Sequence, residues 1–176
     1  GLFPKFSPDG RRIAFQRARD REPRWFSIYI LDLDEEFNAV GSPIEVVYNS
    51  KWAAINPAWS PDGRYLTFAT VHESPAAQSI RRVLMGDDIW AVNVDGQDLT
   101  QLTTSPEPES HPFWTRGKDG KNGRIYFCSK QRGPKNIWSL MPRLPEVYGS
   151  VAGPLPGPVP QNVQPPSPEG KEPPAE

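Results

Sequence analysis

One segment of the sequence recurs along the chain, and this repeat constrains the fold more than any other feature. Residues 4–15, PKFSPDGRRIAF, return as residues 57–68, PAWSPDGRYLTF. A third, more divergent copy begins at residue 112 as PFWT and, after a longer loop, ends at residues 124–127 as RIYF. A period of about 50 residues is typical of folds that stack one supersecondary unit several times.

The local chemistry of each copy predicts an antiparallel hairpin. In Ser-Pro-Asp-Gly, Pro presets φ, the Asp side chain can cap the turn, and Gly accepts a positive φ. The flanking residues alternate between apolar and polar with period two, as in a strand with one buried face. Further strands are predicted at 27–32, 44–48, 88–93, 99–103 and 136–140. Each unit is therefore a meander of three or four strands, and no long helix is expected because no segment keeps a 3.6-residue period.

The second unit carries the pattern in its fullest form. PAWSPDGRYLTF is followed by DIWAVNVDG at 88–96 and LTQLT at 99–103. This succession resembles the TolB-type propeller repeat, and similar blades occur in the tricorn protease and in relatives of prolyl oligopeptidase. The resemblance covers residues 2–141 and implies an all-β fold: a partial β-propeller of about three four-stranded antiparallel blades. Such a resemblance is specific for the fold and not for the function.

The resemblance also implies domain boundaries. We expect propeller blades over residues 1–150, divided at about 2–55, 56–110 and 111–150. The tail, 151–176, has nine prolines and no aromatic residue, so it is expected to be an extended or disordered arm. Such an arm is either a solvated linker or a segment that lies along a partner's surface.

Two departures from the resemblance bear on function. Three blades cannot close a ring, whereas TolB-like propellers usually have six, and the third unit lacks the LTQLT strand. An open wedge exposes apolar blade faces and unpaired strand edges. We therefore expect one of three situations: the missing blades come from another chain, the chain is a fragment of a longer polypeptide, or a partner covers the open faces. Gly1 is interpreted as a processed or truncated end, because no initiating Met or signal peptide precedes it.

Composition excludes some function classes. The 20 basic and 21 acidic residues nearly cancel, which argues against binding to nucleic acid or an anionic membrane through the overall field. No run of 18 apolar residues is present, so no transmembrane segment is predicted. Cys128 is the one cysteine and cannot form an intrachain disulfide.

The sequence contains no pattern of a catalytic or cofactor site. There is no Gly-x-Ser-x-Gly elbow, no phosphate-binding glycine loop and no zinc ligand set. His72 and His111 are the two histidines, and neither stands in a catalytic motif. We therefore predict that the chain is not itself an enzyme and holds no cofactor or metal.

Several residues are nevertheless candidates for partner binding. Arg24, Trp25 and Phe26 lie at an expected hairpin tip and are of types enriched at protein interfaces. The long connection predicted at 69–88 contributes three more candidates, which are His72, Arg81 and Arg82.

Two further candidates stand immediately before prolines. Asn56 precedes Pro57 and His111 precedes Pro112. The resemblance places these residues near one mouth of the propeller channel.

The sequence thus favours a non-catalytic module that binds or scaffolds protein, as an accessory subunit of a larger envelope or extracellular complex. A periplasmic or extracellular location rests on the resemblance alone. The alternative is the propeller part of a larger, peptidase-like enzyme that controls access to a catalytic domain outside this chain. A third hypothesis is a sugar or small ligand at the channel mouth, bound by Trp59, Trp114 and His111.

Overall fold

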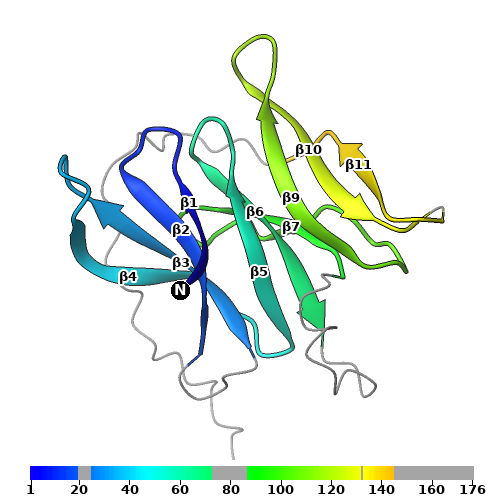
Figure 1. Ribbon diagram of the computed structural model, residues 1–176, viewed down its shortest axis with the longest axis horizontal. Coiled ribbons are helices and arrows are strands. Elements are labelled where there is room, and N and C mark those ends of the chain that lie inside the picture. Colours follow the sequence, from blue (N-terminus) through cyan, green and yellow to red (C-terminus); the bar gives the residue numbers. More distant parts are fainter. Residues whose placement is uncertain (20–24, 73–86, 132, 145–176) are drawn as a thin grey trace, which may run out of the picture.

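The structure, a computed structural model, describes residues 1–19, 25–72, 87–131 and 133–144, and in these segments the chain folds into three antiparallel sheets. We call the sheets blades 1, 2 and 3, and they follow one another in chain order (Figure 1). Blade 1 consists of β1 (Leu2–Phe6), β2 (Arg12–Ala18), β3 (Phe26–Leu33) and β4 (Ala39–Val47). Blade 2 consists of β5 (Trp52–Trp59), β6 (Tyr65–His72), β7 (Ile89–Asn93) and β8 (Thr100–Gln101). Blade 3 consists of β9 (Glu109–Arg116), β10 (Asn122–Ser129) and β11 (Asn136–Leu140).

The predicted all-β partial propeller is confirmed. Each blade is a meander in which neighbouring strands in the chain pair antiparallel. Blade 3 has three strands in the described segments, as expected from a third unit that lacks the LTQLT strand. One detail differs from the sequence-based expectation: β8 spans only Thr100–Gln101, where a strand over 99–103 was predicted. No helix in these segments is long and apolar enough to cross a membrane. The tail 151–176 lies outside the described residues.

The Ser-Pro-Asp-Gly turns of blades 1 and 2 have the same hydrogen bonds. In blade 1 the Gly10 N–H donates to the Ser7 carbonyl at 2.9 Å, and the Ser7 hydroxyl donates to Asp9 Oδ1 at 2.6 Å. In blade 2 the Gly63 N–H and the Ser60 hydroxyl make the corresponding bonds. Gly10 has φ +72° and Gly63 has φ +71°, so both occupy the left-handed region in which a side chain is strained. The identical sequence therefore produces an identical turn.

Blade 3 has a longer turn, but the residues on either side of it are equivalent to those that flank the turn of blade 1. The Ser7 hydroxyl lies 3.2 Å from the Arg12 carbonyl, and Thr115 Oγ1 donates to the Arg124 carbonyl at 2.9 Å. Thr115 therefore corresponds to Ser7, and Arg124 corresponds to Arg12. In blade 2 the same position is held by Tyr65, whose N–H donates to Ser60 Oγ.

The innermost strands β1, β5 and β9 share an irregularity before a proline. Phe3, Asn56 and His111 have φ of 53°, 53° and 55°, and each precedes a proline. The pairing register shifts at each of these points. Proline cannot donate to the ladder, and an irregularity accommodates it at the cost of a residue in the left-handed region.

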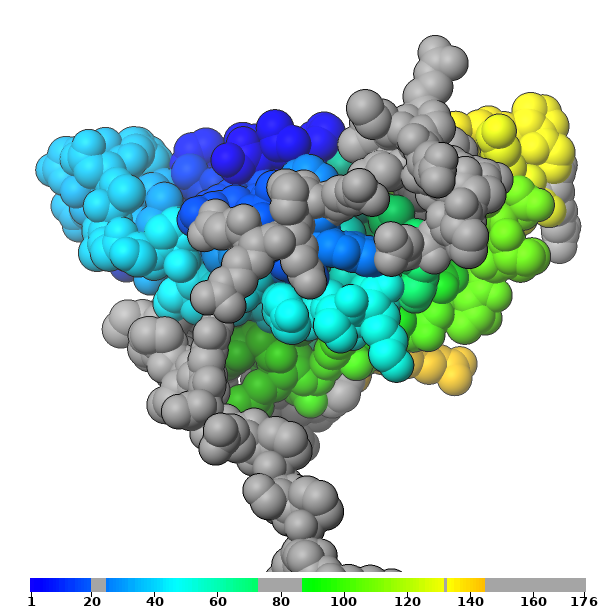
Figure 2. Space-filling model, turned by 90° about the horizontal axis from the view of Figure 1, so that it is seen from below, coloured from blue at the N-terminus to red at the C-terminus, as the bar shows by residue number. Residues whose placement is uncertain are grey.

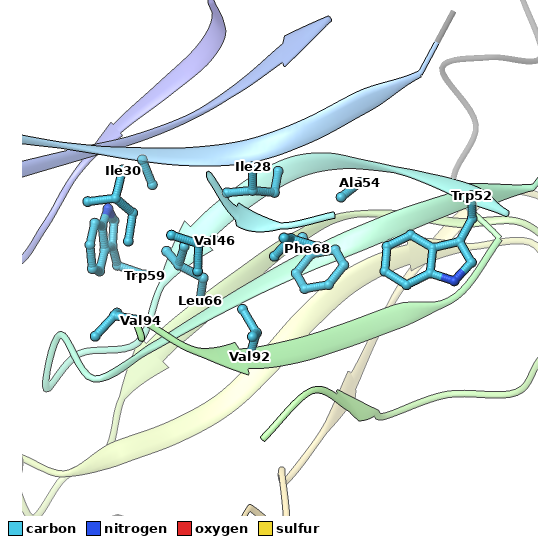
Figure 3. Close-up of a cluster of buried hydrophobic side chains, with 12 residues drawn as sticks. Ile28, Ile30, Val46, Trp52, Ala54, Trp59, Leu66, Phe68, Val92 and Val94 are labelled. Atoms are coloured by element: carbon cyan, nitrogen blue, oxygen red, sulfur yellow. The ribbon is translucent and has the colours of Figure 1, made fainter. Parts of the chain in front are cut away.

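The core consists of two apolar clusters, each between neighbouring blades. Figure 3 shows the first cluster, in which Ile28 and Ile30 of β3 pack on Leu66 and Phe68 of β6 and on Val92 of β7. The second cluster lies between blades 2 and 3. Its main members are Ala53, Ile55, Tyr65, Ala69, Ile89, Ala91, Trp114, Ile125 and Phe127. Each blade is thus stabilised mainly by packing against the next one.

The hydrogen bonds of the Ser-Pro-Asp-Gly turn predict the effect of removing one hydroxyl. Ser60 is fully buried, and its Oγ accepts a hydrogen bond from the Tyr65 N–H at 2.9 Å. Ser60→Ala leaves that N–H without this acceptor, so the free energy of unfolding should fall by about 1–3 kcal/mol in urea denaturation. Ser50→Ala, at an exposed position between β4 and β5, is the control and should change it by less than about 0.5 kcal/mol. Equal urea midpoints for the two variants would show that the turn does not depend on this hydroxyl.

Candidate binding surfaces

The sequence-predicted contact residues are not gathered at one place. Arg24, Arg81 and Arg82 lie outside the described residues. Trp25 and Phe26 are half-buried: Trp25 packs against both apolar clusters, and Phe26, the first residue of β3, packs against the second. Both aromatics thus contribute to the core, and their contact with a partner stays a prediction.

His72 lies on a strand and not in the connection where the sequence pattern put it. It is the last residue of β6, and its ring Nδ1 is 2.9 Å from Asp87 Oδ2. Its backbone N–H donates to the same oxygen at 2.5 Å. The pair therefore joins the end of β6 to the segment that leads into β7.

Asn56 and His111 occupy equivalent places on β5 and β9, as their sequence context predicts. The Asn56 N–H donates to Gln16 Oε1 at 2.7 Å and so ties blade 2 to blade 1. The His111 side chain is exposed, with a ring nitrogen 2.9 Å from Ser110 Oγ. Desolvation and the nearby Lys135 lower the pKa of His111, which favours a neutral ring. Trp59 and Trp114 are buried, so the channel-mouth ligand site that would use them lacks its aromatic surfaces.

A recurrent contact, which we call the interblade joint, links each blade to the next. The first residue of the second strand in one blade covers the last aromatic residue before the turn in the following blade. Arg12 Cζ lies 5.1 Å from the centre of the Trp59 ring, at cation–π distance. Tyr65 lies over Trp114 with ring centroids 6.3 Å apart. In the first joint the Trp59 indole N–H also donates to the Lys5 carbonyl at 2.8 Å.

Each end of the row of blades carries one half of this joint with no matching half from another blade in the described segments; the Phe6 ring instead contacts Phe37 edge-to-face, with ring centroids 6.3 Å apart. Arg124 of blade 3 stands at the position of Arg12 and Tyr65 and is exposed. Its Nε donates to Ser139 Oγ at 2.9 Å and its Nη2 to the Ser139 carbonyl at 3.2 Å, so the guanidinium is held against β11. Phe6 of blade 1 stands at the position of Trp59 and Trp114. It is 58% exposed, whereas those two tryptophans are 7% and 4% exposed.

One register position, which is an isoleucine in every blade, shows the same difference between closed and open blade faces. Ile28 pairs with Gln16, Ile89 with Ala69 and Ile137 with Cys128, and the three pairs occupy the same register in their blades. Ile28 and Ile89 are completely buried between blades, but Ile137 is 69% exposed. The surface that is an interface in blades 1 and 2 is thus uncovered in blade 3.

These observations define two open faces. The blade-3 face contains the exposed residues Phe113, Arg124, Tyr126 and Ile137. The blade-1 face contains exposed Phe6 together with half-buried Ile13, Phe15 and Leu31, which alternate with the buried residues of the same strands. Figure 2 shows the described residues of blade 1, blue and cyan, at one end of the molecule and the yellow strands of blade 3 at the other.

A second feature lies where blades 2 and 3 meet. Burial raises the pKa of Glu109 against the effect of hydrogen bonds from Thr103 and Gln131, and burial likewise raises the pKa of Asp88. Asp88 Oδ1 and Glu109 Oε2 are buried without a hydrogen-bond partner. A pocket of about 380 Å³ shares Thr103 and Gln131, the hydrogen-bond partners of Glu109, and is lined by Thr103, Thr104, Ser105, Pro106, Glu107 and Gln131.

The two carboxyl groups can hold a proton at a pH where exposed carboxyls are ionised. In the segments that the structure describes, no group of three or more His, Cys, Asp or Glu is placed to hold a metal ion. No sequence motif marks Glu109, because a lone Glu before a Ser-His-Pro carries no recognisable spacing.

In comparisons with known proteins, no protein-family model matches the chain. The chain is 26% identical over 115 residues to a Bacillus subtilis protein named as the peptidase YuxL, and this alignment covers 64% of the chain and 15% of that protein. It is 24% identical over 173 residues to a Streptomyces coelicolor protein named as tricorn protease homolog 2, and this alignment covers 86% of the chain and 13% of that protein. The chain therefore spans only a small part of the length of these relatives.

Solved structures give the same result at the level of fold. A structure named as a TolB from Agrobacterium tumefaciens aligns with TM-score 0.56 and 25% identity over 80% of this chain and 42% of its own. A puromycin hydrolase aligns with TM-score 0.54 and 18% identity over 78% of this chain and 20% of its own. A Mycobacterium tuberculosis puromycin-hydrolyzing peptidase aligns with TM-score 0.53 and 17% identity over 79% and 20%.

The three stacked meanders define the class: the chain is a row of β-propeller blades. Within that class, its fold is similar to those of TolB- and tricorn-like propellers.

The open blade-3 face predicts opposite outcomes for two equivalent isoleucines. Ile89→Ala creates a cavity in a closed interblade core and should cost about 2–5 kcal/mol of unfolding free energy. Ile137→Ala, at the same register position, should change the unfolding free energy of the monomeric chain by less than about 0.5 kcal/mol. Urea denaturation measures both. A loss at Ile137 in a monomeric sample as large as that at Ile89 would show that this face is covered by the chain itself.

The buried Glu109 predicts a pH-dependent effect. Because its folded pKa is raised above the ordinary value of 4.5, protonation stabilises the fold fully below pH 4.5, and this contribution is lost as the pH rises through the folded pKa. Glu109→Gln keeps a neutral side chain at every pH. The variant should therefore be more stable than the parent at neutral pH and should lose this advantage below pH 4.5.

Urea midpoints at the two pH values test this, with Glu107→Gln, at an exposed neighbouring position, as the matched control. A stability difference at Glu109 that does not vary with pH would contradict the raised pKa.

Proposed function

We propose that the chain is a non-catalytic protein-binding and scaffolding module whose two open faces bind further β-blades. The observation that carries the proposal is the isoleucine at one register position, which is buried in blades 1 and 2 and 69% exposed in blade 3. A surface built like two interfaces of the same chain is suited to form a third.

The physical gain from covering these faces supports the proposal. Full burial of one Ile or Phe side chain is worth about 1.5–3 kcal/mol. Phe113, Ile137 and Phe6 are each more than half exposed and lie on faces whose counterparts are closed. Contiguous exposed apolar surface on a sheet face is typical of interaction sites.

The environment of the two histidines supports a role without catalysis. Asp87 Oδ2 contacts the His72 ring and also accepts the His72 backbone N–H, so this carboxylate closes the end of β6. Among the hydrogen bonds of the described residues, the His72 ring contacts no hydroxyl or thiol that it could activate. His111 contacts the hydroxyl of the adjacent Ser110, but the charge that affects its pKa is that of Lys135. A general base that activates a hydroxyl is normally oriented by a carboxylate or another acceptor, and a cation does not fulfil that role.

A second candidate function is a propeller part of a peptidase that controls substrate access to a catalytic domain. Its support is the similarity to YuxL, to the tricorn protease homolog and to the puromycin-hydrolyzing enzymes. In this proposal the blades on the open faces belong to the same enzyme. An envelope location, periplasmic or extracellular, is proposed on the TolB resemblance, and the nearly balanced charge favours protein over nucleic acid as the partner.

Site-specific photo-crosslinking in the source cells tests the proposal. A photoreactive amino acid at Ile137 should crosslink to a polypeptide segment made of propeller blades, identified by mass spectrometry. The same group at Lys118, exposed on the hairpin tip of blade 3, is the matched control and should not give this product. Absence of any blade-containing product from Ile137 and from Phe6 would contradict the proposed function.

The identity of the product separates the two candidate functions. A separate scaffold chain or envelope component favours the binding module. A segment of an enzyme that also contains a catalytic domain favours the peptidase-associated propeller.

A further inference from the structure

One pair of residues, which we call the turn clamp, joins the hairpin turns of blades 2 and 3. Asn122 Nδ2 donates to Asp62 Oδ2 at 2.9 Å, and the Asp62 N–H donates to Asn122 Oδ1 at 3.1 Å. Asp62 belongs to the Ser-Pro-Asp-Gly turn of blade 2, and Asn122 is the first residue of β10. The clamp depends on an amide that faces a carboxylate, because an amide nitrogen donates and an ionised carboxylate only accepts.

Asn122 is followed by Gly123, and this is the one Asn-Gly pair in the sequence. Asparagine is a thermolabile residue, and its amide is most open to attack when the following residue has no side chain to hinder the approach. We propose that Asn122 is a site of spontaneous deamidation, and that the product cannot re-form the turn clamp. The modification would thus loosen blade 3 from blade 2.

The reaction needs only the chain and water. The Gly123 backbone nitrogen attacks Asn122 Cγ and forms a new C–N bond, while its proton passes to the amide nitrogen, which leaves as ammonia. The five-membered succinimide that results is opened by one water molecule at either of its carbonyl carbons. The products are aspartate and isoaspartate at position 122, and no group is oxidised or reduced.

Packing keeps the labile pair in place, because position 123 accepts only a glycine. Gly123 is buried, and a Cβ built on it would lie 2.9 Å from both the carbonyl oxygen and Oγ1 of Thr115, and 3.0 Å from the Gly117 nitrogen. Two of these three atoms are backbone atoms of the same hairpin, so a side chain at position 123 would displace the hairpin itself. The fold therefore requires the residue that makes Asn122 reactive.

The surroundings of Asn122 both permit the reaction and restrain it. Asn122 is half-buried, so water reaches it, and the pairing register of β9 and β10 shifts directly after it. Ring formation moves the amide group and finally removes its nitrogen, so the hydrogen bonds to Asp62 oppose the reaction. The rate of deamidation should therefore depend on how often the clamp opens.

The products differ from asparagine at the atom that the clamp uses. Aspartate at position 122 places a carboxylate oxygen where Nδ2 stood, 2.9 Å from Asp62 Oδ2, and two ionised carboxylates at this distance repel each other. Isoaspartate also lengthens the backbone of β10 by one carbon, next to the tightly packed Gly123. The contact of Arg116 Nη2 with the Pro61 carbonyl, at 3.1 Å, does not involve Asn122 and remains between the two turns.

Peptide mapping by mass spectrometry tests the modification. The purified full chain is incubated at neutral to mildly alkaline pH and digested with a protease that leaves residues 122 and 123 in one peptide. Asn122 should convert to aspartate and isoaspartate, which chromatography separates. Asn136, exposed in the same blade but followed by the branched Ile137, is the internal control and should stay intact. An Asn122 that stays intact in the folded chain while the urea-unfolded chain converts would overturn the proposed site.

Asp62→Asn tests the restraint by the clamp. This variant places an amide nitrogen opposite Asn122 Nδ2 and removes a hydrogen bond to a charged acceptor. Conversion of Asn122 should become faster by roughly tenfold, the factor that corresponds to about 1.4 kcal/mol. An unchanged rate would show that the clamp does not control the reaction.

Urea denaturation tests the structural consequence. Asn122→Asp reproduces one product and should lower the urea midpoint. The double variant Asp62→Asn/Asn122→Asp exchanges the amide and the carboxylate across the clamp, and should regain the parent midpoint. Asn136→Asp is the charge-matched control and should not change the midpoint, because Asn136 Oδ1 accepts the Ile137 N–H and a carboxylate keeps that acceptor. Equal midpoints for Asn122→Asp and the parent, or a double variant no more stable than Asn122→Asp, would contradict the loosening of blade 3.

Discussion

The packing of each blade against the next is the interaction on which the structure depends. The sheets contribute hydrogen-bonded ladders, but both apolar clusters lie between blades and not within one. A single three- or four-stranded sheet has no other surface against which to bury its apolar face. Trp59 shows how closely the blades are coupled, because its ring lies beneath Arg12 and its indole N–H reaches the Lys5 carbonyl of the preceding blade. Within the part of the chain that the structure describes, each end blade consequently packs against a neighbouring blade on one side only.

Much of the fold could be predicted from the sequence because the repeat contains its own turn. Ser-Pro-Asp-Gly dictates the hairpin locally, and the alternation on either side of it dictates which face is buried. The limits of the strands were less accessible. β8 is reduced to Thr100–Gln101 and β6 continues to His72, since strand ends are decided by pairing with neighbours that the local pattern does not contain.

The candidate surfaces were harder to predict than the fold. The exposure of Ile137 is invisible in the sequence, where DIW and NIW look alike; only the presence or absence of a neighbouring blade distinguishes Ile89 from Ile137. Arg124 could be aligned from the RIYF ending of the third copy, and the Thr115–Arg124 hydrogen bond agrees with that alignment, but its exposure depends on the neighbouring blade and not on the local pattern. Glu109 carried no motif, and its altered pKa arises from burial. Trp25 and Phe26 were singled out by residue type, but the core uses a large part of their surface.

At the irregularity before each inner proline, the backbone is similar in all three blades but the side chain differs. Phe3, Asn56 and His111 have nearly the same positive φ, 53°, 53° and 55°, although their side chains are an aromatic ring, an amide and an imidazole. The backbone at this point is determined by the following proline and by the register shift, so the residue type is free to differ from blade to blade. The inner rim of such a propeller can therefore acquire new chemistry one blade at a time, by single substitutions that leave the scaffold unchanged.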